Sequence, residues 1–365
     1  MQRSAYVLPC LTIFLSLIFG ACSSDPSSPD VPDASAVVDS IAKKHMSEKP
    51  IPGLSLAVVN GGELVQQSSY GVAELASMQP TTNASIYQLA SATKLFTGIG
   101  LMMLVEDGRI ALDDPIRDYL PDLPDAWRGV TVRQTISHTA GLPNLLNEEG
   151  DPPGGTMSSA WHNVQTKPLR TMPGTVWSYN QMGSEVIRRI AEKVSGQSWE
   201  SFVQERILDP AGMQTTYFLR QASPDSSRVT TGYDLEDGSL IAHNWATSYS
   251  WYIPTAMGIY STTRDLARLS RALRSGALLS ASARKTMWTP TPHDEGGFPV
   301  WGGDEGYGIG WIADTHDGHE RRWHSGGGHS TFVYYPDDDL TVIVLTNLSG
   351  ADPNAIANDI AGAFL

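Results

Sequence analysis

Three serine–lysine pairs in the sequence have the spacing that lets a lysine amine take a proton from a serine hydroxyl. They are Ser40/Lys43, Ser91/Lys94 and Ser282/Lys285. Residues i and i+3 share one face of a helix, so the two groups can meet, and a serine deprotonated in this way attacks carbonyl carbon. Only the second pair begins a segment, residues 89–105, that is apolar on nearly every side and predicts a buried helix.

Lys94 is the lysine whose chemistry burial would change. Removal from water destabilises the ammonium form and lowers the lysine pKa toward the neutral amine, which accepts protons. The first and third pairs lie in an amphipathic and a polar segment, where both side chains are expected to be solvated. We therefore predict Ser91 as a nucleophile with Lys94 beside it. A buried lysine paired with a carboxylate is the alternative.

Two later segments fit the same chemistry. Residues 173–183 place Tyr179 and two amide side chains in a loop just before a predicted helix. Residues 323–328 read Trp-His-Ser-Gly-Gly-Gly and predict a strand edge with little side-chain bulk. Glycines there let a substrate carbonyl approach backbone N–H groups, as an oxyanion hole requires.

Other kinds of site lack their signatures. The sequence contains no Gly-x-Ser-x-Gly, no His-Glu-x-x-His and no paired Cys-x-x-Cys, so neither a nucleophile elbow nor a zinc site is expected. We predict no metal and no cofactor. With 25 basic against 39 acidic residues the net charge is −14, which argues against nucleic acid and against electrostatic adhesion to anionic lipid.

The N-terminus predicts export. Residues 6–20 are almost wholly apolar but shorter than the roughly 20 residues of a spanning helix, so residues 1–21 are predicted as a signal peptide. Residues 18–22, Ile-Phe-Gly-Ala-Cys, resemble a bacterial lipobox, with Cys22 lipid-modified and residues 22–33 a flexible tether. We expect a periplasmic or cell-surface lipoprotein that contacts the membrane through this anchor only. An ordinary signal peptide with a leftover cysteine is the alternative.

Both ends of the remaining chain predict strands. A hairpin is expected over 54–72 around Asn60-Gly61-Gly62, and four more strands near the C-terminus, at 306–313, 321–325, 330–335 and 340–346. Helices are expected at 34–48, 181–196, 263–274 and 352–365. We expect one antiparallel sheet in an α/β lobe (34–105 and 300–365), with a mostly helical lobe (106–299) inserted. A cleft between two such lobes favours a small-molecule site.

With these motifs in order, residues 35–365 resemble the serine hydrolase family of class C β-lactamases, family VIII-type esterases and DD-peptidases. The matching elements are Ser91-Ala-Thr-Lys94, Tyr179-x-Gln181 for Tyr-x-Asn, His324-Ser325-Gly326 for Lys-Thr-Gly, and the landmarks 112–116, 137–143 and 346–347. The resemblance implies an α+β fold of the β-lactamase/transpeptidase type: an antiparallel sheet flanked by helices, plus an inserted helical lobe. His138, in the second landmark, is assigned to the loop scaffold.

The resemblance also implies roles. Ser91 would form an acyl-enzyme, while Lys94 and Tyr179 would move protons and activate the deacylating water. The substrate oxyanion would lie between the backbone N–H groups of Ser91 and Gly327. The implied substrate-binding set is Ser91, Gln181, His324, Ser325, Gly326 and Gly327.

Two positions depart from the family pattern. Gln181 stands where the third residue of Tyr-x-Asn is Asn, although Ser178-Tyr179-Asn180 could instead be the Ser-x-Asn variant. His324 replaces a lysine, and a histidine, whose ordinary pKa is near 6.5, is mostly neutral at pH 7. A steady positive charge for a substrate carboxylate is therefore weakened, which favours uncharged acyl donors.

Three functions follow as hypotheses. The first is an exported serine hydrolase acting on carboxylic esters or small amides. The second is a β-lactamase or D-Ala-D-Ala carboxypeptidase acting on β-lactams or peptidoglycan. The third, from another class, is a catalytically silent penicillin-binding-like protein.

Overall fold

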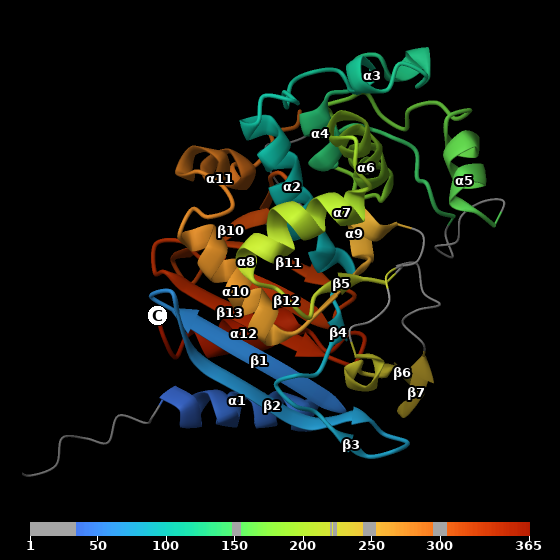
Figure 1. Ribbon diagram of the computed structural model, residues 1–365. Coiled ribbons are helices and arrows are strands. Elements are labelled where there is room, and N and C mark those ends of the chain that lie inside the picture. Colours follow the sequence, from blue (N-terminus) through green and yellow to red (C-terminus); the bar gives the residue numbers. More distant parts are fainter. Residues whose placement is uncertain (1–33, 148–154, 220, 222–224, 244–252, 295–304) are drawn as a thin grey trace, which may run out of the picture. The chain divides into compact units, whose positions relative to one another are not determined.

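The structure is a computed structural model that describes residues 34–147, 155–219, 221, 225–243, 253–294 and 305–365 (Figure 1). The predicted signal peptide, Cys22 and the tether lie outside the described residues and stay predictions. Within the described ranges, no helix has the length and apolar character needed to cross a membrane.

One antiparallel sheet joins the two ends of the described chain. Its strand order is β3-β2-β1-β13-β12-β11-β10-β9. The strands are β1 (Gly53–Asn60), β2 (Glu63–Glu74), β3 (Gln79–Pro80), β9 (Gly306–Tyr307), β10 (Ile312–His316), β11 (His319–Gly326), β12 (Ser330–Tyr335) and β13 (Leu340–Thr346). Strand β1 pairs with β13 from Leu54↔Thr346 to Asn60↔Leu340. The expected sharing of one sheet by the first hairpin and the last strands is therefore confirmed.

Both faces of this sheet are covered. Because successive side chains of a strand point to opposite faces, β1 divides its residues between two cores. Ala57 and Val59 pack in the core that contains α2 (Lys94–Glu106). Leu56 and Val58 pack in a second core with α1 (Ala34–Glu48) and α12 (Pro353–Ala361).

The middle of the chain supplies most of the remaining helices. These are α3 (Ile116–Tyr119), α4 (Val132–Ile136), α5 (Met157–Val164), α6 (Met182–Ser195), α7 (Trp199–Val203), α8 (Asp209–Ala211), α9 (Pro254–Met257), α10 (Thr263–Arg274) and α11 (Ala281–Trp288). Figure 1 shows α3 to α6 at the end of the molecule away from α1, whereas α10 lies over the sheet. Short strands form a second sheet, β4 (Tyr87–Gln88), β8 (Ile259–Ser261) and β5 (Tyr217–Phe218), and a hairpin, β6 (Gly232–Glu236) and β7 (Ser239–His243). The α+β class is confirmed.

The expectation of one strand over 306–313 is wrong. The chain turns between β9 and β10, where the Gly308 amide donates to the Trp311 carbonyl at 2.8 Å and Gly310 has a φ of +76°. This turn lies against α2: a Cβ on Gly98 would be 2.0 Å from the Ile309 carbonyl oxygen. The alternation of residues 306–313 suggested one strand, but Gly308 and Gly310 form a turn that packs on α2.

We predict that Gly98→Ala destabilises the protein by about 1–3 kcal/mol, since the new methyl forces the 308–311 turn off α2. Helix propensity alone predicts that the substitution stabilises the protein, because Ala inside a helix is about 1 kcal/mol more favourable than Gly. Denaturant unfolding measures the difference. Gly129→Ala is the matched control, since a Cβ there meets nothing within 4 Å and it should change stability by less than about 0.5 kcal/mol. A Gly98→Ala protein as stable as the parent would contradict the contact.

Candidate active site

Ser91 lies on a tight turn that leads directly into α2. It belongs to a 3₁₀ turn, η1 (Ala90–Thr93), rather than to a continuous helix over 89–105. In a 3₁₀ turn residues i and i+3 are aligned, so Ser91 and Lys94 keep the expected shared face. Ala90 has a φ of +43°, a left-handed conformation that costs energy for a residue with a side chain and is found preferentially at functional sites. Ser91 itself is half-buried.

Lys94 is the first residue of α2 and is fully buried. Its Nζ donates to the Ala256 carbonyl of α9 at 3.1 Å and lies 4.8 Å from the centre of the Tyr179 ring. No ion pair joins Lys94 to a carboxylate among the described residues, so the alternative of a lysine–carboxylate pair finds no support. Burial lowers the pKa of Lys94 to about 7, which leaves a large fraction of the amine neutral at physiological pH.

Tyr179 comes from the loop before α6 and completes the group around Ser91. Its phenol oxygen is buried, and burial raises the pKa of Tyr179 to about 12. Hydrogen bonding to the side chains of Ser91 and Gln181 lowers it in part. The structure thus brings Ser91, Lys94 and Tyr179 together, with a protonated phenol next to the serine hydroxyl.

The amides around Tyr179 have different surroundings. The Asn180 side chain hydrogen-bonds the local backbone at both of its polar atoms. Its Nδ2 donates to the Ser178 carbonyl at 3.1 Å and its Oδ1 accepts from the Gly183 amide at 3.3 Å. Gln181 interacts with the phenol, and its buried Oε1 has no hydrogen-bond partner in the described chain. This arrangement fits the register in which Gln181 is the third residue of the motif.

Strand β11 presses its end against the backbone around Ser91. A Cβ on Gly326 would lie 2.0 Å from the Leu89 carbonyl oxygen and 2.7 Å from the Ser91 amide nitrogen. The Ser330 hydroxyl donates to the same Leu89 carbonyl at 2.7 Å. Gly327, directly after the strand, is exposed, and within the described chain its amide has no acceptor. Two backbone N–H groups, of Ser91 and Gly327, therefore belong to segments held in direct contact.

His324 is a neutral imidazole with both nitrogens in use. Its Nδ1 lies 2.7 Å from the Ser325 carbonyl, which only accepts, so Nδ1 carries the proton. Its Nε2 is 3.0 Å from the Tyr307 hydroxyl and accepts from it. Burial, with a smaller contribution from Lys94, lowers the pKa of His324 to about 3. The sequence suggested a mostly neutral side chain here, and with this lower pKa His324 is neutral at pH 7.

Tyr307 and His138 are neighbours of the site that sequence reasoning did not place there. The His138 ring centre lies 4.5 Å from that of Tyr179 and 4.7 Å from that of Tyr307. Burial keeps the pKa of His138 well below its ordinary value. The His138 carbonyl accepts from the Ser178 amide at 2.8 Å, so its loop also holds the Tyr179 loop in place. The 137–143 landmark located His138, but no local signal pointed to Tyr307.

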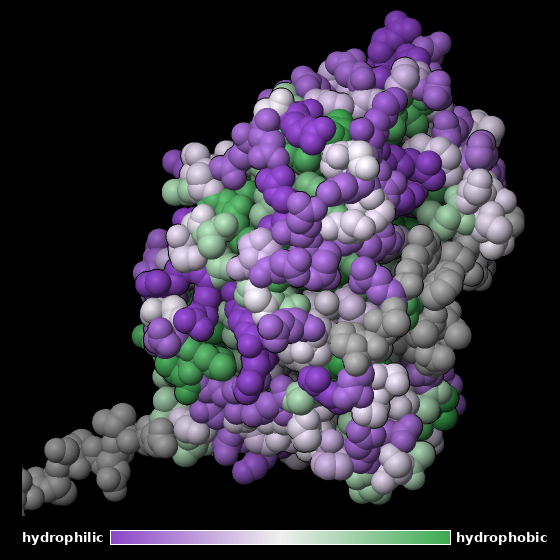
Figure 2. Space-filling view, in the orientation of Figure 1, coloured by the Kyte–Doolittle hydropathy of each residue, from purple (hydrophilic) through white to green (hydrophobic). Residues whose placement is uncertain are grey.

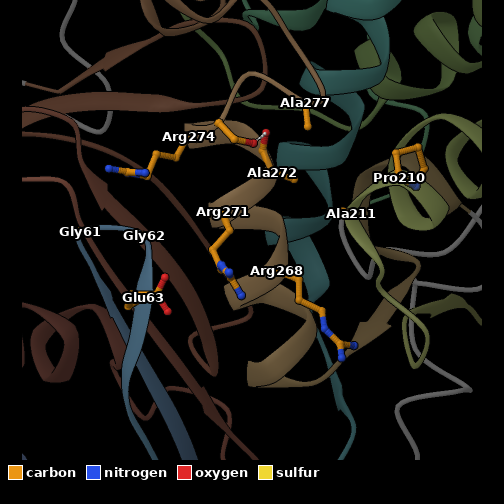
Figure 3. A pocket seen from close by; sticks show the side chains of 11 residues that line it. Gly61, Gly62, Glu63, Pro210, Ala211, Arg268, Arg271, Ala272, Arg274 and Ala277 are labelled. Carbon is orange, nitrogen blue, oxygen red and sulfur yellow. Dashed lines mark hydrogen bonds between the residues drawn. The ribbon is translucent and has the colours of Figure 1, made fainter. Parts of the chain in front are cut away.

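Two surface cavities lie outside this group of residues. One, of about 370 Å³, opens between the β1–β2 turn and α10; its lining includes Glu63, Arg268, Arg271 and Arg274 (Figure 3). The visible face over α7 and α10 is predominantly hydrophilic (Figure 2). The other, of about 450 Å³, lies between residues 143–147 and 167–170.

In the part of the chain that the structure describes, no three His, Cys, Asp or Glu side chains gather to hold a metal ion.

Comparisons with known proteins agree with this geometry. A family model described as Beta-lactamase matches residues 38–364. Penicillin-binding protein 4* of Bacillus subtilis (strain 168) is 28% identical over 336 residues, covering 85% of this chain and 70% of that protein. The octameric penicillin-binding protein homologue from Pyrococcus abyssi superposes with a TM-score of 0.77 at 27% identity, covering 90% of this chain and 76% of that one.

A further solved structure supports the fold alone. EstCE1, described as a hydrolase with promiscuous acyltransferase activity, has a TM-score of 0.76 at 18% identity and covers 90% of this chain and 98% of its own. The resemblance found in the sequence is confirmed. The chain belongs to the β-lactamase family and is a serine hydrolase of that family.

Proposed function

We propose that this protein is an exported serine hydrolase that forms an acyl-enzyme on Ser91 and acts on carboxylic esters or small uncharged amides. The observation that carries the proposal is the contact of a half-buried serine with a buried phenol, beside a lysine whose pKa is about 7. A nucleophilic serine needs a base that is neutral at working pH, and Lys94 meets this condition.

The proposed reaction has two steps. In the first, the Ser91 oxygen bonds to the acyl carbon while its proton passes through the Tyr179 phenol to the neutral Lys94 amine. The bond to the alcohol or amine breaks, and the leaving group takes the proton. In the second step water attacks the acyl-enzyme by the same route, which releases the acid and restores Ser91. The amides of Ser91 and Gly327 would stabilise the oxyanion of each tetrahedral intermediate.

The charge of the substrate distinguishes the proposed esters from β-lactam and cell-wall substrates. A β-lactam or a D-Ala terminus carries a carboxylate, and binding it in a buried site favours a nearby cation. His324 is neutral and its two nitrogens are occupied by Ser325 and Tyr307. We therefore favour esters over the β-lactam and cell-wall substrates that the names of the penicillin-binding relatives suggest. Gln181, His324, Ser325 and Gly326 would form the walls of the substrate site.

Location is proposed from the N-terminal sequence. The apolar residues 6–20 followed by Cys22 favour a lipoprotein held at a membrane by that cysteine alone. Cys22→Ala removes the attachment point, so cell fractionation should move the protein from the membrane to the soluble fraction. Unchanged membrane association would exclude the anchor.

The central test is labelling and turnover at Ser91. The chain from residue 23 onward is offered a short-chain p-nitrophenyl ester, a chromogenic cephalosporin, a D-Ala-D-Ala peptide and a fluorophosphonate probe, beside a Ser91→Ala control. We expect ester turnover and one labelled serine, both lost in Ser91→Ala. Ser282→Ala, at an exposed serine of the third spacing match, should retain both. Preference for the cephalosporin or the peptide supports the second hypothesis, and labelling without any turnover supports the silent binding protein.

The charge argument predicts the effect of His324→Lys. A lysine there should raise kcat/KM for an acyl donor that bears a carboxylate, relative to its uncharged analogue, by about tenfold, since a charge-assisted hydrogen bond contributes roughly 1.5–3 kcal/mol. The ratio is measured with paired substrates, and His324→Gln serves as the neutral control. An unchanged ratio, or a wild-type protein that already prefers the charged donor, would show that His324 does not set substrate charge.

A further inference from the structure

Resting on the acyl-enzyme chemistry proposed above, we propose that His329 is a positioning residue for the oxyanion hole. Its imidazole bonds the Gly327 carbonyl and packs on the Gly327 backbone, and these two contacts fix the conformation of the residue whose amide we place at the space beside Ser91. His329 does not itself contact the reacting atoms.

The ladder between β11 and β12 ends before the peptide in question. Its last residue pair is Gly326↔Ser330, so residues 327–329 lie outside the regular pairing. Gly327 and Gly328 have φ values of +57° and +67°, which only glycine adopts readily in succession. Flexible residues outside a ladder need another contact to fix their peptide planes.

His329 supplies that contact. Its Nδ1 lies 3.1 Å from the Gly327 carbonyl oxygen, which accepts the N–H. The ring also packs on the Gly327 backbone, because a Cβ at that position would be 2.3 Å from Cε1 and 2.5 Å from Nδ1. The side chain is 2% exposed, so water does not compete for this hydrogen bond.

The imidazole is itself firmly held. The His329 amide donates to the Gly326 carbonyl at 3.0 Å, and its carbonyl accepts from the Thr346 amide of β13 at 2.7 Å. The Gln88 backbone, three residues before Ser91, also interacts with the ring. Burial lowers the pKa of His329 to about 4, so the ring is neutral at pH 7.

The turn is clamped to the Ser91 segment on either side of Gly327. Gly326 touches the Leu89 and Ser91 backbone, and the Ser330 hydroxyl bonds Leu89. The Gly327 N–H lies in the Gly326–Gly327 peptide, whose carbonyl accepts from the His329 amide, while the imidazole holds the next peptide through the Gly327 carbonyl. Loss of the imidazole removes the second of these contacts and leaves Gly327 held on one side only. Loss of one oxyanion donor costs about 10²–10³ in kcat, so misorientation of Gly327 should cost part of this.

A set of three variants tests the inference. In His329→Asn the amide nitrogen takes the place of Nδ1; in His329→Gln it takes the place of Nε2; His329→Leu has no donor. We expect kcat on the ester to fall about 10- to 100-fold in the His329→Leu and His329→Gln variants, with KM changed less than threefold. The His329→Asn variant should recover most of the loss. Affinity for an uncharged boronic acid, which mimics the tetrahedral intermediate, should fall in parallel with kcat/KM.

Controls separate this inference from the proposed function. Thermal unfolding reports the folding of each variant, and His162→Leu, at an exposed histidine of α5, should behave as wild type. Equal kcat in the Asn and Gln variants, or wild-type kcat in Leu, would overturn the positioning role while leaving Ser91 chemistry intact. If the His329→Leu protein does not fold, the difference in kcat between the His329→Asn and His329→Gln variants still tests the positioning role. Ester turnover that survives Ser91→Ala would overturn the proposed function instead.

Discussion

Burying an ammonium ion in an apolar core costs free energy, and the site depends on the shift that this cost produces in the pKa of Lys94. Lys94 begins a helix whose first turns are buried on all sides, and its amine donates a hydrogen bond to the Ala256 carbonyl. Since no carboxylate among the described residues forms an ion pair with it, burial lowers the pKa of the amine to about 7. The apolar burial that stabilises the fold thus produces a group that can act as a base.

The rest of the fold brings distant segments to this amine through close backbone contacts. Gly98 lets the 308–311 turn lie on α2, and Gly326 lets β11 lie on the backbone before Ser91. The loop that contains His138 holds the Tyr179 loop through the Ser178 amide. Each contact leaves no room for a side chain or depends on a backbone hydrogen bond, so the arrangement is set by packing that tolerates little displacement.

The sequence predicted the parts of the fold that have local causes. The hairpin around Asn60-Gly61-Gly62, the helix at 263–274 and the apolar context that singles out Ser91/Lys94 depend on periodicity and turn residues within a few positions. The Ala256 carbonyl at Lys94 and the Tyr307 hydroxyl at His324 come from segments more than ten residues away. Such contacts leave no trace in local spacing. The roles of Tyr179, Gln181 and Gly327 came from resemblance and stay proposals.

The pH dependence of Ser91 acylation tests the role of Lys94 most directly. An uncharged fluorophosphonate reacts with the serine in one irreversible step, so its second-order rate constant reports the state of the base in the free protein. Because the neutral amine is the active form, the rate should rise with pH through a single ionisation near 7 and level off above it, with no further change until the phenol titrates near 12. A rate that is flat between pH 5 and 9, or that rises only near pH 10, would contradict a buried neutral lysine as the base.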